Sequence, residues 1–220
     1  MVASTTPEGQ ACAVLQPAVA EAARRAGATA VRLVDLVGGP RPGTARDLEL
    51  DRVLTTYGDG RALGDPGAST RLTCRVVGDL PVPATTVPPV VGRHAVPLGR
   101  DLEARLAATL DACAGPDGDV LTVVLTAWAL ARVPRARRQG VVDVLLGAAR
   151  PPAWVSVEGV GVAPGVPTLG DRPASGHSLV SVALVGDGRC VPEVVARCWS
   201  RGAVLAWLAA AGEGAGVSPS

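Results

Sequence analysis

A strand, a helix and a second strand follow one another between residues 119 and 157, and this unit constrains the fold more than any other part of the chain. Residues 119–126 are apolar on both faces, which is typical of a central strand in a parallel sheet. Pro134 then opens a helical pattern that covers residues 135–149. Residues 153–157 form the second strand. The unit predicts an α/β protein whose parallel strands are joined by helices.

The rest of the chain continues this alternation. Residues 10–26 have helical spacing and stop at Gly27, and residues 30–37 are a β-branched apolar run that predicts a buried strand. A half-buried strand, a helix and two late apolar segments follow, at 70–77, 101–113, 178–185 and 191–208. We therefore predict a Rossmann-like α/β fold, with a largely parallel sheet flanked by helices and a C-terminal antiparallel strand pair.

The length of the chain fits one domain of this class. We expect all 220 residues to belong to a single domain. Within it, residues 1–28 are an N-terminal helix region, 29–211 are the α/β core, and the small, polar residues 212–220 are a disordered tail.

The charge of the chain argues against nucleic acid as a partner. All 21 basic residues are arginines, and 20 acidic residues leave a net charge of +1. A nucleic-acid-binding domain usually has a marked basic excess or a basic stripe. The densest basic run is Arg132, Arg135, Arg137 and Arg138, and we interpret it as the solvated start of a helix. The absence of lysine also excludes a phosphate-binding G-x-x-x-x-G-K-[ST] loop.

Cysteine usage and hydropathy predict a cytoplasmic protein that does not enter a membrane. Five cysteines are scattered without a C-x-x-C pair, and the N-terminus has no positively charged leader, which together favour reduced thiols. Every unbroken apolar run is far shorter than the roughly 18 residues that a spanning helix needs. With only two histidines, His94 and His177, we expect no zinc site.

A series of short motifs carries a resemblance to a known family. The motifs are Asp51-Arg52, Tyr57-Gly58-Asp59-Gly60, Gly64-Asp65-Pro66, Arg71-Leu72-Thr73-Cys74, residues 123–133, Trp154-Val155-Ser156-Val157-Glu158-Gly159, Ala196-Arg197-Cys198, Gly202 and Leu205-Ala206-Trp207-Leu208. In their order and spacing they resemble the bacterial family known as domain of unknown function 2332. The layout of that family resembles a class I S-adenosylmethionine-dependent methyltransferase.

The resemblance implies where a cofactor would bind. In that layout a glycine-rich loop follows the first strand, and the ligand lies beyond the carboxyl ends of the strands. Asp35, Gly38 and Gly39 would then hold S-adenosylmethionine, since glycines allow a close backbone approach and an acid can bind ribose hydroxyls. Glu158 ends a later strand on the same edge and is the candidate catalytic base. Both acids also have a structural interpretation, as turn or capping residues.

The chain departs from the family pattern in two places near this site. Pro40 and Pro42 stiffen the loop after the first strand and remove two backbone N–H donors. The family has a segment that resembles G-L-D-L-N-P-L-D. The corresponding residues 92–99 of this chain keep glycine and proline but lack both acids and the asparagine. His94 is the residue of this segment that would replace a lost acid.

Other conspicuous residues have structural interpretations. We interpret the Tyr57-Gly58-Asp59-Gly60 motif as a turn, His177 as a surface residue, and Trp154, Trp199 and Trp207 as core residues.

Three functions in different classes follow from these observations. The first is a methyltransferase-like domain with a degenerate cofactor site, acting as a scaffold or as a binding protein for a small molecule or a protein. The alternative is an active S-adenosylmethionine-dependent methyltransferase, with Asp35, Gly38 and Gly39 on the cofactor and Glu158 near the substrate. The third is an assembly subunit that forms a homo-oligomer. Members of the family that the chain resembles have further helical segments, and their absence here would leave apolar surface exposed.

Overall fold

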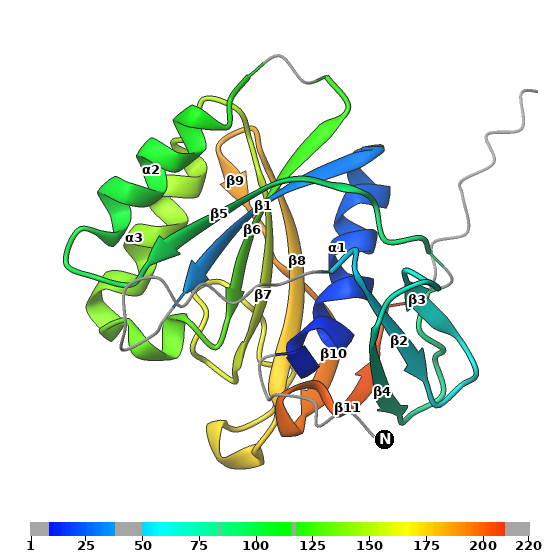
Figure 1. The fold of residues 1–220 in the computed structure, drawn as a ribbon. Coiled ribbons are helices and arrows are strands. Elements are labelled where there is room, and N and C mark those ends of the chain that lie inside the picture. Colours follow the sequence, from blue (N-terminus) through cyan, green and yellow to red (C-terminus); the bar gives the residue numbers. More distant parts are fainter. Residues whose placement is uncertain (1–8, 38–49, 84, 116–117, 210–220) are drawn as a thin grey trace, which may run out of the picture.

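The computed structural model describes residues 9–37, 50–83, 85–115 and 118–209 (Figure 1). The α-helices are α1 (Cys12–Ala26), α2 (Leu102–Ala112) and α3 (Arg135–Leu146). The strands are β1 (Ala30–Val37), β2 (Val53–Tyr57), β3 (Ala62–Gly64), β4 (Thr70–Val76), β5 (Val90–Pro97), β6 (Val120–Ala127), β7 (Ala153–Gly159), β8 (Ser178–Gly186), β9 (Arg189–Cys190), β10 (Glu193–Trp199) and β11 (Val204–Trp207). Short 3-10 helices are η1 (Gly9–Ala11), η2 (Leu130–Arg132), η3 (Pro173–Ser175) and η4 (Ser200–Gly202). None of the helices in these ranges is long and apolar enough to cross a membrane.

The predicted parallel block lies in one half of the sheet. The strands follow the order β3-β2-β4-β11-β10-β8-β7-β6-β1-β5, with β9 attached to β8. β1 lies between β5 and β6 and is parallel to both, and β6 is parallel to β7. α2 connects β5 to β6 and α3 connects β6 to β7, and both helices cover the same face (Figure 1). The α/β class and the strand-helix-strand unit are confirmed.

The sheet becomes antiparallel beyond β7. β8 runs against both β7 and β10, and β10 runs against β11. These strands are neighbours in sequence and in space, so the chain passes between them without a crossover helix. The predicted C-terminal antiparallel pair is confirmed, and it belongs to a larger antiparallel block.

Three short strands extend the sheet past β11. β4 pairs with β11 in parallel through Arg75 and Val76, β2 pairs with β4 in parallel, and β3 closes a hairpin with β2. The sequence pattern predicts β4, whereas β2 and β3 are findings of the structure. These strands lie on the far side of α1 from the parallel block (Figure 1).

α1 is enclosed on all sides. Every residue from Cys12 to Ala23 is buried, because β6, β7 and β8 pack on one side of the helix and the β2–β4 strands on the other. The polar Gln16 side chain is 0% exposed and forms hydrogen bonds with β2 and with the residues before it. Its Nε2 donates to the carbonyls of Leu50 (2.8 Å) and Val53 (3.0 Å), and its Oε1 accepts from the hydroxyl of Thr55 (2.5 Å). The helix ends at Gly27, whose φ of 66° is left-handed.

A second core lies on the opposite face of the sheet, under α2 and α3. Leu36 of β1, Val124 of β6 and Trp154 of β7 belong to it, together with Leu106 and Leu145 of the helices. The indole N–H of Trp154 donates to the Thr126 hydroxyl at 2.9 Å. Side chains alternate between the two faces along a strand. A strand residue that belongs to one core therefore shows which face each of its neighbours occupies.

Candidate functional site

The carboxyl ends of β1, β6 and β7 meet at one edge of the sheet because these strands are parallel. The chain reaches β5 on one side of β1 and then crosses to β6 on the other side. In open α/β sheets, ligands bind outside the carboxyl ends of the strands where the strand order reverses in this way. This edge is therefore the place where the predicted site residues would have to meet.

Asp35 lies near the carboxyl end of β1 and is 7% exposed. It pairs with Ala95 of β5 and Leu125 of β6. Leu33, two residues earlier, packs in the core around α1. Since alternate strand residues share a face, the Asp35 side chain is on the α1 face.

His94 lies on the other face of the sheet. It pairs with Val34 of β1, which belongs to the core under α2 and α3. β5 is the outermost strand at this end of the sheet, and His94 is exposed on it. Asp35 and His94 lie at adjacent positions of the neighbouring strands β1 and β5, but their side chains are on opposite faces of the sheet.

Glu158 is 1% exposed and holds the turn that follows β6. Its carboxylate accepts hydrogen bonds from the backbone N–H groups of Leu130 (2.8 Å) and Ala131 (3.3 Å), at the start of η2. Burial raises the pKa of Glu158 to about 7, and the amide donors offset part of that rise. The residue thus has the capping role that its structural interpretation describes.

The predicted residues do not converge in the described part of the chain. Glu158 lies four residues after Trp154 and shares its face, under α3, whereas Asp35 faces α1. Gly38 and Gly39, with Pro40 and Pro42, lie outside the described residues.

A charged cluster that sequence patterns missed lies at the start of β8. His177 is 9% exposed, so its interpretation as a surface residue is wrong. Its Nε2 is 3.0 Å from Oδ2 of Asp171, which also accepts from Nε of Arg197 at 2.7 Å. Arg197 and then His177 lower the pKa of Asp171. The pairing of β8 with β10 brings Arg197 close to His177, which precedes β8. No local sequence pattern could have predicted this contact. The His177 ring is 5.4 Å from that of Trp199.

Strained backbone marks two strand ends at this edge. Trp128, which follows β6, has a φ of 53°, and Ser200 and Arg201, which follow β10, have φ of 49° and 54°. The Trp128 N–H donates to the Val157 carbonyl at 2.8 Å, and its indole donates to Ser178 Oγ at 2.9 Å. Left-handed non-glycine residues cost on the order of 1–3 kcal/mol each and tend to gather at functional sites.

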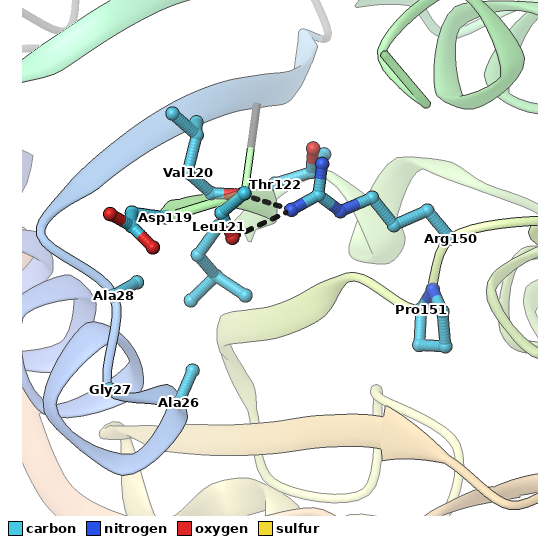
Figure 2. A pocket seen from close by; sticks show the side chains of 10 residues that line it. Ala26, Gly27, Ala28, Asp119, Val120, Leu121, Thr122, Arg150 and Pro151 are labelled. Carbon is cyan, nitrogen blue, oxygen red and sulfur yellow. Dashed lines mark hydrogen bonds between the residues drawn. The ribbon is translucent and has the colours of Figure 1, made fainter. Parts of the chain in front are cut away.

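One cavity of the structure lies at the opposite, amino-terminal edge of the sheet. It measures about 400 Å³ between the end of α1, the start of β6 and Arg150. Figure 2 shows the Arg150 side chain reaching toward the backbone at the start of β6. Its guanidinium donates to the carbonyls of Gly115 (2.8 Å), Gly118 (3.3 Å) and Val120 (3.2 Å). These hydrogen bonds hold the backbone at the start of β6 in place.

A smaller cavity, of about 270 Å³, lies at the carboxyl edge on the side of α2 and α3. It is lined by Leu98, Gly99, Arg100, Arg132, Val133, Pro134 and Arg137. Arg137 builds its wall, since it donates to the carbonyls of Gly99 (3.1 Å) and Arg100 (2.9 Å) and pairs with Glu103. The basic run is thus only partly the solvated helix start that its sequence indicates. We name this the arginine cavity.

The fold and its carboxyl edge define an α/β protein of Rossmann-like type, with a mixed sheet and helices on both faces. The chain belongs to the family described as an uncharacterized protein conserved in bacteria, domain of unknown function 2332, whose model matches residues 98–207. The matched residues begin after β5 and include β6, β7, β8 and β10. Comparison with curated proteins and with solved structures finds no match.

Proposed function

We propose that this chain is a methyltransferase-like domain with a degenerate cofactor site, and that it serves as a binding or scaffold protein. The observation that carries the proposal is the separation of Asp35 from His94 and Glu158 by the sheet. A nucleoside cofactor needs several polar groups that converge in one crevice. The described residues do not supply that set.

The environment of Glu158 supports the same conclusion. A general base has to come within hydrogen-bonding reach of the proton that it removes, directly or through one water. A pKa of about 7 suits proton transfer, but the side chain is 1% exposed and its two oxygens accept from the Leu130 and Ala131 amides. Its contacts favour the role of a buried cap over that of a base.

Calorimetric titration with S-adenosylmethionine and with S-adenosylhomocysteine tests this proposal. We expect no heat from either compound when the protein shows a cooperative unfolding transition. Micromolar binding, equivalent to about −8 kcal/mol, would contradict the proposal if Asp35→Ala abolished it. Asp119→Ala is the matched control, because Asp119 is exposed at the opposite edge. That result would support the active methyltransferase instead.

A further inference from the structure

Two of the arginines that line the arginine cavity have no counter-charge among the described residues. Arg100 and Arg132 line it, and neither makes a hydrogen bond or ion pair through its side chain with another described residue. Arg137 differs, because Glu103 balances its charge. Like charges held near one another raise the free energy of the folded protein unless a counter-charge offsets them.

The walls of the cavity leave little that would accept a hydrogen bond. Arg137 already occupies the carbonyls of Gly99 and Arg100, and Glu103 is bound to the same guanidinium. The remaining lining side chains are apolar, apart from those of Arg100 and Arg132. A ligand here would therefore find donors and positive charge, which suits an anion.

The size of the cavity narrows the choice of anion. Ligand pockets of drug-sized molecules measure roughly 300–1,000 Å³, and this cavity is about 270 Å³. It suits a small group better than a whole nucleoside cofactor. Two lining arginines on different elements, Arg100 before α2 and Arg132 in η2, suit a doubly charged anion whose oxygens point in several directions.

We propose that the arginine cavity binds a small phosphate-bearing anion through Arg100 and Arg132, with Arg137 as the positioning residue that holds the walls. The inference deepens the proposed binding role and rests on it, since it names the class of ligand. It does not involve Asp35, His94 or Glu158. Failure of one proposal can therefore be told from failure of the other by separate titrations.

Calorimetric titration with inorganic phosphate and pyrophosphate, in a low-salt buffer free of other multivalent anions, tests the inference. We expect binding that weakens as ionic strength rises. The double variant R100A/R132A should bind at least tenfold more weakly, with an unfolding midpoint no lower than that of the wild type, since both side chains are exposed and unpaired among the described residues. Arg132→Ala alone should give an intermediate affinity.

Arg135→Ala is the matched control for charge. Arg135 is an exposed arginine at the start of α3 that does not line the cavity. We expect its phosphate affinity to stay within about twofold of the wild type. Three results would overturn the inference: no heat from either phosphate compound, equal losses in R135A and R100A/R132A, or acetate binding as tightly as phosphate.

Discussion

The hydroxyl of Tyr57 donates a hydrogen bond of 2.7 Å to the carbonyl of Ala13. In an unbroken helix this carbonyl would accept from the N–H of the residue four positions later, but that residue is Pro17, which has no N–H. A side chain of β2 thus replaces the donor that α1 lacks. Tyr57, which we interpreted as part of a turn motif, has its side chain buried against the central helix.

We predict that Tyr57→Phe lowers the free energy of unfolding by roughly 1–3 kcal/mol, because the buried Ala13 carbonyl loses its donor. Urea denaturation in two backgrounds checks the cause. In a Pro17→Ala background the helix regains an N–H at position 17, so the same substitution should cost less there. Equal costs in both backgrounds would show that the Ala13 contact does not explain the loss.

Gly64 is a second point where β2 and β3 close against α1. Its φ is +103°, and a Cβ there would overlap the Val53 carbonyl oxygen and lie 2.6 Å from Nε2 of Gln16. We expect Gly64→Ala to destabilise the protein by roughly 3 kcal/mol or more, through strain and a broken Gln16 network. Gly60 also has a positive φ, +85°, but open space around it. Gly60→Ala should cost only about 1–2 kcal/mol in the same urea measurements, and similar losses at both sites would refute the steric explanation.

Glu158 should make stability depend on pH near neutrality. Its folded-state pKa of about 7 is above the ordinary value of 4.5, so between these values the folded protein keeps a proton that the unfolded chain releases. The free energy of unfolding therefore falls as pH rises from about 4.5 to 7, on the order of 3 kcal/mol in total, and is level above that.

The difference between the wild type and Glu158→Gln isolates this effect, because the other groups titrate in both proteins. Urea denaturation from pH 5 to 8 should show the variant gaining stability relative to the wild type as pH rises. A difference that stays constant over this range would mean that Glu158 does not titrate there.

Arg150 should matter for stability although it is partly exposed. Its side chain satisfies the carbonyls of Gly115, Gly118 and Val120 at the entry of β6. We expect Arg150→Ala to cost about 1–3 kcal/mol, and Arg150→Lys to recover only part of it, since an ammonium group cannot reproduce the planar fork. Arg189→Ala, which removes an exposed arginine on β9, is the control and should be close to neutral by thermal unfolding.

Local patterns were sufficient for the long elements of this fold. β1 has the predicted bounds of 30–37, and α1, α2 and β6 begin and end within two residues of the predicted ones. Each is a long periodic run with clear stop signals such as Gly27. β2 and β3 were not predicted, because short strands depend on partners far away in the sequence.

The candidate site shows a similar division. Position at a strand end predicted that Asp35 and Glu158 lie toward the same edge, which follows from parallel pairing. Position alone did not predict the face, which depends on the register between strands. A shift of one residue would have put Asp35 on the same face as His94. The Asp171–His177–Arg197 cluster depends on the antiparallel register of β8 and β10, for which the sequence carries no local signal.

The enclosure of α1 has a consequence for how the protein is made. The ribosome releases this helix before the strands that surround it, β2 to β4 and β6 to β8, and β8 is the last of these strands to be synthesised. Until then its apolar surface stays exposed to solvent or to a chaperone. Nascent chains that stop before β8 should therefore be held in an unfolded, protease-sensitive form, and the domain should acquire its structure only after β8 has left the ribosome.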